Sequence, residues 1–227
     1  MKTTGNLMET LGVLWTTWIV GDCAVLAKNQ NNLNIVDIGS HVGLTARYFN
    51  YRHPHSDITC YEPNPNTFSI LKQNISKYKN IKAFNAAVHD FNGSSKLRLG
   101  DDAWGDSLLF KSSAPTIKVD VISASSVCSK HIDLLKIDGE GSEYAIMLDL
   151  DKTNIIKNVD NIVMEYHGLI NNKKRLKKIL DIFRKHHFTF SIGYIFRILA
   201  VSETEVLNNN SKKYDYLIIS AHKDNSV

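Results

Sequence analysis

The sequence has few cysteines, little net charge and nothing that divides it into segments. Only three of its 227 residues are cysteines, Cys23, Cys60 and Cys128, and none forms a Cys-x-x-Cys pair. Reduced thiols in a cytoplasmic protein, with no cysteine metal site, are therefore expected. The formal net charge of +4 is compatible with an anionic substrate but does not require a nucleic-acid partner. Because no internal repeat or low-complexity linker is present, residues 1–227 are expected to form one domain.

A long apolar run is also absent. The most apolar stretch near the start of the chain, residues 11–20, is about ten residues long and too short to cross a bilayer, so no membrane span is expected. It has some of the layout of a secretory signal. However, Trp15 and Trp18 are three residues apart and share one helical face, which favours an amphipathic helix within an N-terminal helical segment, residues 1–33.

Short apolar runs alternate with helical periodicities along the rest of the chain. This alternation predicts an α/β fold with a mainly parallel sheet and helices on both faces. Strands are expected at residues 34–38, 57–61, 81–88, 94–99, 117–122, 132–137, 161–165, 188–193 and 214–221, and helices at residues 44–51, 66–78, 140–150 and 171–187.

The first strand leads into an Asp-x-Gly-x-x-x-Gly turn that runs from Asp37 to Gly43. Glycine at position 39 would let the backbone approach a ligand closely, and ligands of such sheets bind at the carboxyl ends of the strands. The dinucleotide pattern Gly-x-Gly-x-x-Gly is absent, and Asp37 favours a partly cationic ligand. The alternative is a plain strand–turn–helix whose glycines serve packing.

The second strand ends at Glu62, 23 residues after Gly39. A carboxylate at this spacing can accept hydrogen bonds from both ribose hydroxyls of a nucleoside. The alternative is an exposed carboxylate at a strand end.

Three carboxylates follow the strand at residues 132–137, namely Asp138, Glu140 and Glu143. Like charges this close are costly unless they are solvated, paired or used. Favourable interaction with a helix dipole explains Glu143, but Asp138 is expected to line the ligand edge. Asp138 and Glu140 could bridge a divalent metal, but two carboxylates do not establish one, so no metal ligand is assigned and the need for a metal stays open.

The strand at residues 161–165 is followed by His167. Glu165 and His167 are two residues apart, so their side chains share one face of an extended chain. A histidine at a strand end can serve as a general base near neutral pH. The alternative is a structural histidine that is hydrogen-bonded at the sheet edge.

Together these motifs resemble the FkbM-type methyltransferases, class I Rossmann-like enzymes that use S-adenosylmethionine. The resemblance covers residues 34–167, the expected donor-binding core, and residues 168–227 would add a C-terminal helix and strands. Two residues differ from the family pattern, His41 in place of Asn and Gly139 in place of an apolar residue. The matching motifs are Asp37-Ile-Gly-x-x-x-Gly, Tyr61-Glu-Pro-Asn-Pro, Asn85-Ala-Ala, Leu135-Lys-Ile-Asp-x-Glu-Gly-x-Glu and Glu165-Tyr-His.

The resemblance implies a Rossmann-like three-layer sandwich with a seven-strand-type sheet, whose last strand is antiparallel. It also implies a methyltransferase of class EC 2.1.1 that methylates a hydroxyl of a sugar or another small-molecule natural product. The expected residues for binding S-adenosyl-L-methionine are Asp37, Gly39, Ser40, Gly43, Glu62, Asn64, Asn85, Ala86 and Asp138.

For catalysis, His167 is the expected base and Asp138 the residue that orients the acceptor, with Glu140 as a further candidate. The loop at residues 100–110, with Trp104, is expected to border the acceptor. Two alternatives stay open: a nucleic-acid methyltransferase, and a non-catalytic module that binds a nucleoside or a partner protein. Nucleic acid is disfavoured because the basic run at residues 173–178 fits the solvated face of a helix.

Overall fold

The computed structural model describes residues 32–99, 115–167, 173–194, 199–208 and 216–223. Nearly all of the N-terminal segment and the whole loop at residues 100–110, including Trp104, lie outside the described residues. In the part of the chain that the structure describes, no helix is both long and apolar enough to span a membrane.

Eight strands form the main sheet, in the order β10-β9-β11-β8-β7-β1-β2-β3. Within this sheet, β8, β7, β1, β2 and β3 run parallel to one another. Strand β11 lies between β8 and β9 and is antiparallel to both. The Rossmann-like, mainly parallel sheet with an antiparallel last strand is thus confirmed, with β10 added at one edge. The strands are β1 (Asn34–Ile38), β2 (Asp57–Tyr61), β3 (Ile81–Phe84), β7 (Ile132–Ile137), β8 (Val159–His167), β9 (Phe188–Tyr194), β10 (Leu199–Val201) and β11 (Tyr216–Lys223).

Helices cover both faces of this sheet and give the molecule two main cores. On one face, α2 (Leu44–Arg52) and α3 (Pro65–Ile75) bury Phe49 and Leu71 against β1 and β2. On the other face, α5 (Glu143–Lys152) and α6 (Lys173–Lys185) bury Met147 and Phe183. Successive side chains of β1 point to opposite faces of the sheet, so Ile35 packs in the first core and Val36 in the second.

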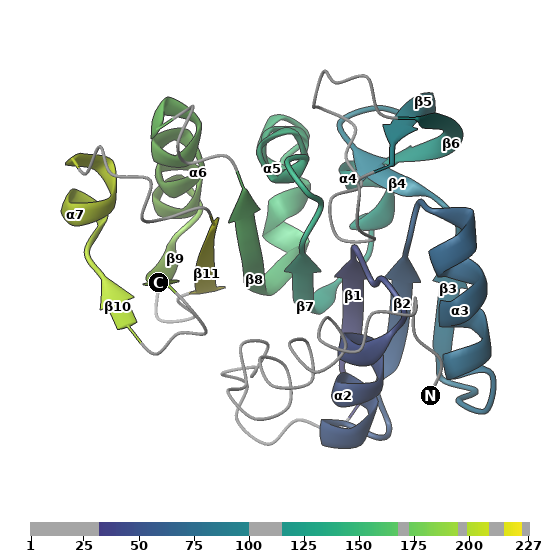
Figure 1. The fold of residues 1–227 in the computed structure, drawn as a ribbon. Coiled ribbons are helices and arrows are strands. Elements are labelled where there is room, and N and C mark those ends of the chain that lie inside the picture. The colour runs from purple at the N-terminus through teal and green to yellow at the C-terminus, as the bar shows by residue number, and fades with distance from the viewer. Residues whose placement is uncertain (1–31, 100–114, 168–172, 195–198, 209–215, 224–227) are drawn as a thin grey trace.

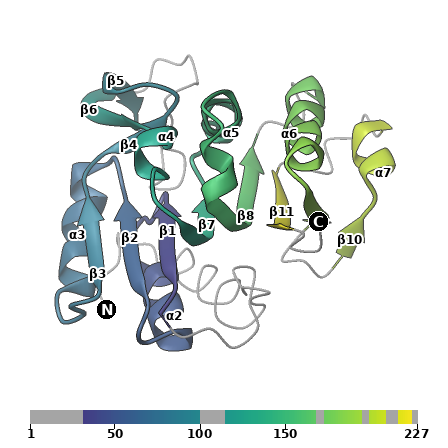
Figure 2. The same ribbon diagram turned by 180° about the vertical axis from the view of Figure 1, so that it is seen from behind.

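A second sheet, in the order β4-β6-β5, lies beyond the tips of β1 and β2 in both views (Figure 1 and Figure 2). Its strands are β4 (Ala87–His89), β5 (Gly93–Arg98) and β6 (Thr116–Ser123), and the short helix α4 (Ala124–Val127) follows β6. The predicted single strand at residues 81–88 was therefore wrong. The chain leaves the main sheet after Phe84, and Asn85 holds the break by donating its side-chain amide to the carbonyls of Glu62 (2.8 Å) and Pro63 (2.9 Å).

The start of α5 also differs from the prediction, at Glu143 rather than Glu140. Glu140 and Gly141 have φ values of 48° and 105°, which a right-handed helix does not accommodate. Glu140 consequently lies in a turn at the carboxyl edge of the sheet and not on the helix.

The basic residues of α6 lie on the face of the helix that is exposed to solvent. Leu176 is buried, while Lys174, Arg175, Lys177 and Lys178 around it are exposed. The predicted solvated face is confirmed. A 3-10 helix (Ile155–Asn158) precedes β8, and α7 (Glu203–Asn208) follows β10.

Candidate active site

A cleft of about 710 Å³, part of it open to solvent, lies at the carboxyl ends of β1, β2 and β7. The main sheet forms one side, and residues of β4 and β5 in the second sheet form the other. Its lining consists of Ile38, Gly39, His41, Tyr61, Glu62, Pro63, Ala86, Ala87, Val88, Leu97, Asp138, Gly139, Glu140 and Ser142.

Gly39 brings the turn after β1 close to the turn after β7. Its φ is +75°, and a Cβ at this position would lie 1.8 Å from the backbone oxygen of Asp138. The Gly39 amide donates to the Tyr61 carbonyl (3.0 Å), and the Asp138 amide donates to the Ile38 carbonyl (3.1 Å). Only glycine fits here because the Asp138 carbonyl fills the space of a Cβ, and Gly39 therefore contributes backbone alone to the lining of the cleft.

Glu62 presents a carboxylate that the backbone holds in place. It is 6% exposed, its Oε2 accepts from the His41 amide (3.0 Å), and its Oε1 accepts from the Asn64 amide (2.9 Å). Charge-assisted bonds of this kind are stronger than neutral ones. The carboxylate is therefore fixed at the cleft wall, as expected for a group that accepts hydrogen bonds from a ligand.

Lys136 connects two predicted site residues, a role that sequence reasoning missed. Its Nζ lies 3.3 Å from Asp37 Oδ1 and 3.2 Å from Asp138 Oδ2, and it donates to the Gly39 carbonyl at 2.8 Å. Asp37 and Lys136 are register partners on adjacent strands, a pairing that the sequence alone does not give. Asp37 is fully buried, so its charge is balanced by Lys136 inside the protein.

The predicted catalytic residues Asp138, Glu140 and His167 come together. One ligand atom from each lies within 4.8 Å of the other two. His167 Nε2 is 3.5 Å from Glu140 Oε2 and 3.4 Å from Glu165 Oε1. The shared face predicted for Glu165 and His167 is thus confirmed. Asp138 and Glu140 belong to the lining of the cleft, and His167 does not.

Glu143 makes specific hydrogen bonds in addition to the favourable interaction with the helix dipole that was expected for it. The side chain is fully buried, and its Oε1 accepts from the amides of Gly139 (3.0 Å) and Gly141 (2.9 Å). The same oxygen lies 3.2 Å from His167 Nδ1. Glu143 therefore ties the turn after β7 to the imidazole at the end of β8.

These contacts and the burial of the cluster change the pKa values of His167 and Glu140. Burial alone would lower the pKa of His167, but its hydrogen bonds to Glu143 and Glu165 raise it well above the ordinary value. Burial raises the pKa of Glu140 to about 8, with opposing and reinforcing effects from the charges around it. An imidazole in this setting carries a proton near neutral pH.

The residues predicted to bind the donor fall into two sets. Gly39, Glu62, Ala86 and Asp138 line the cleft. The others, Asp37, Ser40, Gly43, Asn64 and Asn85, are outside the lining.

Residues outside the lining have visible structural roles. Ser40 Oγ donates to the Asp37 carbonyl (2.7 Å), and the Asn64 side chain caps the start of α3. Gly43 has a φ of +84°, and a Cβ there would meet Leu71 Cδ1 at 2.6 Å. These residues shape the two turns that carry Gly39 and Glu62.

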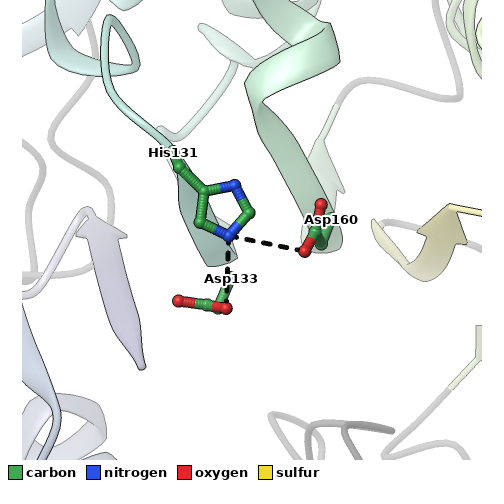
Figure 3. Close-up of side chains that lie close together, drawn as sticks. All are labelled: His131, Asp133 and Asp160. Atoms are coloured by element: carbon green, nitrogen blue, oxygen red, sulfur yellow. Dashed lines mark hydrogen bonds and ion pairs between the residues drawn. The ribbon is translucent and has the colours of Figure 1, made fainter. Parts of the chain in front are cut away.

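Two groups among the described residues have the composition to hold a metal ion. One is the cluster of Asp138, Glu140 and His167 at the cleft. The other lies at the amino ends of β7 and β8 (Figure 3), where His131 Nε2 is 3.3 Å from Asp133 Oδ1 and 3.5 Å from Asp160 Oδ2. The second group is more open, with the His131 side chain 56% exposed.

Comparison with known proteins gives consistent matches. The family profile described as the methyltransferase FkbM domain matches residues 37–190. Methyltransferase 1 of Beauveria bassiana (strain ARSEF 2860) is 24% identical over 173 residues, covering 64% of this chain and 69% of that protein.

Solved structures show the same fold. Methyltransferase FkbM from Methylobacillus flagellatus KT aligns with a TM-score of 0.58 at 13% identity, covering 91% of this chain and 47% of that one. The present chain thus spans about half the length of that structure. The plantazolicin methyltransferase BpumL, solved in complex with SAH, aligns with a TM-score of 0.51 at 12% identity, covering 95% and 84% of the two chains.

Proposed function

The chain belongs to the FkbM methyltransferase family, and we propose that it transfers the methyl group of S-adenosyl-L-methionine to a hydroxyl of a sugar or another small-molecule acceptor. The observation that carries this proposal is the cleft between the bare backbone at Gly39 and the fixed carboxylate of Glu62. These are the features that a nucleoside at the carboxyl edge of such a sheet requires. The similar fold of BpumL in complex with SAH supports the assignment of the donor.

The charge of the cleft suits this donor. The lining includes the carboxyl side chains of Glu62, Asp138 and Glu140 and, within the described part of the chain, no lysine or arginine. S-adenosylmethionine carries a sulfonium and an ammonium, which such a lining attracts, whereas a phosphate backbone would be repelled. A small neutral acceptor therefore fits the cleft better than a nucleic acid.

The reaction needs the acceptor oxygen in line with the methyl–sulfur bond. The methyl carbon bonds to that oxygen, the sulfur keeps the electron pair of the broken bond, and the hydroxyl proton passes to a base. Positioning supplies much of the rate because the sulfonium is already activated. We assign the orientation of the acceptor to Asp138, whose carboxylate is held by Lys136.

The base is better placed at Glu140 than at His167, the residue that the sequence favoured. Glu140 lines the cleft, while both ring nitrogens of His167 lie within 3.5 Å of surrounding carboxylates. His167 then acts as a positioning residue for Glu140.

Calorimetry with S-adenosylmethionine and SAH tests the donor, and a labelled methyl donor offered to pools of sugars and hydroxylated small molecules tests the acceptor. We expect micromolar or tighter donor binding and transfer of label to a hydroxylated compound. Failure to bind either nucleoside would refute the proposal. Donor binding without transfer to any pool would instead identify a non-catalytic module.

A further inference from the structure

We propose that Asp138, Glu140 and His167 form a binding site for a divalent cation of the Mg²⁺ and Mn²⁺ class, next to the donor cleft. From the sequence, two carboxylates alone did not establish a metal, and the structure adds His167 to them as a third ligand. The site stands on the geometry of the cluster alone, whereas its role toward the acceptor rests on the proposed function.

The spacing of the three side chains fits one ion. Their ligand atoms lie within 4.8 Å of one another, and two donors that share an ion at about 2.2 Å are separated by roughly 3–4.4 Å. Small side-chain shifts therefore close the site. Asp138, Glu140 and His167 keep 22%, 30% and 16% of their side-chain surface exposed, so an ion can enter from the cleft.

Independent support comes from the residue behind the imidazole. A histidine that ligates a metal usually donates its other ring N–H to a carboxylate, which fixes its tautomer and its orientation. Glu143 fills this role, with Oε1 3.2 Å from His167 Nδ1. Glu143 is itself fully buried and held by two backbone amides, while its Oε2 is buried without a hydrogen-bond partner.

This arrangement directs Nε2 of His167 at the cluster. Two carboxylates, Glu140 at 3.5 Å and Glu165 at 3.4 Å, face this nitrogen. A histidine with a purely structural role needs one acceptor on each nitrogen, whereas here a buried carboxylate holds one nitrogen and two more gather at the other. A cation bound at this point would take the place of the Nε2 proton, because histidine ligates a metal only in its neutral form.

The balance of charge points the same way. The carboxylates of Asp138, Glu140, Glu143 and Glu165 surround Lys136 and His167, so acidic groups outnumber basic ones. Partly buried carboxylates need compensation, and a dication that replaces the proton of His167 would add one net positive charge to the cluster. The sulfonium of the donor would add to that balance from the side of the cleft.

The ligand set selects the kind of ion. Carboxylate oxygens suit Mg²⁺ and Mn²⁺, and one imidazole is acceptable to Mn²⁺. Three protein ligands leave coordination positions open for an acceptor oxygen, whose hydroxyl the ion would make more acidic. The proton then passes to the Glu140 oxygen that does not hold the ion, and the methyl group moves from sulfur to the acceptor oxygen.

The group of His131, Asp133 and Asp160 is a matched control in the same protein (Figure 3). It also has one histidine and two carboxylates but is more exposed, and no carboxylate among the described residues holds the second nitrogen of His131. The proposal predicts that Mn²⁺ distinguishes the two groups.

The experiment is a titration of chelator-treated full-length protein with Mn²⁺, followed by the electron paramagnetic resonance signal of free Mn²⁺. We expect one ion bound per chain, with affinity lowered about tenfold or more in E140Q and H167Q and about 10–100-fold in E143Q. The H131Q and D160N variants should bind as the parent does. Circular dichroism melting checks that each variant is folded.

Two results would overturn the site: no Mn²⁺ binding by folded protein, or binding that survives H167Q and E140Q and is lost in H131Q. Calorimetry with S-adenosylmethionine on the same samples separates this proposal from the function. Mn²⁺ binding at the cluster without donor binding would sustain the site and refute the methyl donor, and the reverse result would do the opposite.

Discussion

Two glycines with left-handed backbones flank the turn after β1, and they differ in what a side chain would meet. A Cβ at Gly39 would collide with the backbone oxygen of Asp138, while at Gly43 it would meet the end of the Leu71 side chain. Flexible side chains move at small cost and packed backbone does not. The two positions therefore separate the cost of backbone strain from the cost of a clash.

We expect Gly39→Ala to lower the free energy of unfolding by about 3 kcal/mol or more, and Gly43→Ala by about 1–2 kcal/mol, the usual cost of a left-handed alanine. Urea unfolding of both variants measures this. Equal losses would show that the turn after β7 can move away from Gly39, contrary to a rigid cleft floor.

Glu62 allows a test of donor binding at a single side chain. Glu62→Ala should weaken the affinity for S-adenosylmethionine by about 1–3 kcal/mol, because hydrogen bonds to a charged group are lost. Asp57→Ala, at the exposed opposite end of β2, should leave the affinity unchanged. Calorimetry that finds the two variants alike would remove Glu62 from the donor site.

For single residues, the sequence indicated which residues lie at the cleft better than it indicated which atoms they contact. Gly39, Glu62 and Asp138 were predicted and do line the cleft, because strand ends in a parallel sheet share one edge. Asn85 was also predicted to contact the donor; its amide nitrogen bonds to two backbone carbonyls, and its contact with the donor stays a prediction. Its partner depends on a turn that no local pattern specifies.

At the level of elements, α5 and α6 are joined by an ionic contact near their C-terminal ends. Asp151 Oδ1 lies 2.7 Å from both Lys185 Nζ and His186 Nε2, and the side chains of Asp151 and His186 are each 13% exposed. Burial raises the pKa of Asp151, but the hydrogen bonds from Lys185 and His186 outweigh it and lower the pKa below its ordinary value.

Asp151→Asn should therefore destabilise the protein by about 1 kcal/mol at neutral pH. Because the folded pKa is lowered, this contribution is present above the unfolded value of about 3.9 and is lost as pH falls through the folded value. Asp181→Asn removes an exposed pair with Arg184 and should cost about 0.5 kcal/mol or less. Denaturant titrations at pH 7 and pH 3 check both variants; a loss from Asp151→Asn that persists undiminished at pH 3 would contradict the ionic origin.

The bounds of helices and strands were predicted correctly where the apolar periodicity is regular. The predictions were wrong where the backbone conformation or hydrogen bonds of a single residue set the boundary. The strand β7 was predicted with its exact bounds. By contrast, the left-handed Glu140 delays α5 by one turn, and the break at Asn85 sends β4 into another sheet. Both deviations lie at the cleft, where the backbone departs from the conformations that local propensity favours.

For the whole molecule, donor binding should appear as added stability. A ligand that binds only the folded state at about 100 times its Kd stabilises it by roughly 2.7 kcal/mol. S-adenosylmethionine should thus raise the Tm in a thermal-shift experiment, whereas NAD, for which the glycine pattern is missing, should not. A shift with NAD and none with S-adenosylmethionine would overturn the choice of donor.

The position of β11 ties the site to the order in which the chain is made. This strand is the last that the structure describes, yet it fills the space between β8 and β9 and pairs with Glu165 and His167 along β8. During synthesis, β8 leaves the ribosome well before the partner that completes its hydrogen bonding. Until residues 216–223 emerge, the strand that carries His167 keeps an open edge, and such edges invite pairing with other chains. The strand that carries His167 is therefore completed only when β11 inserts, and a chain stalled before residue 216 would leave this end of β8 without its antiparallel partner.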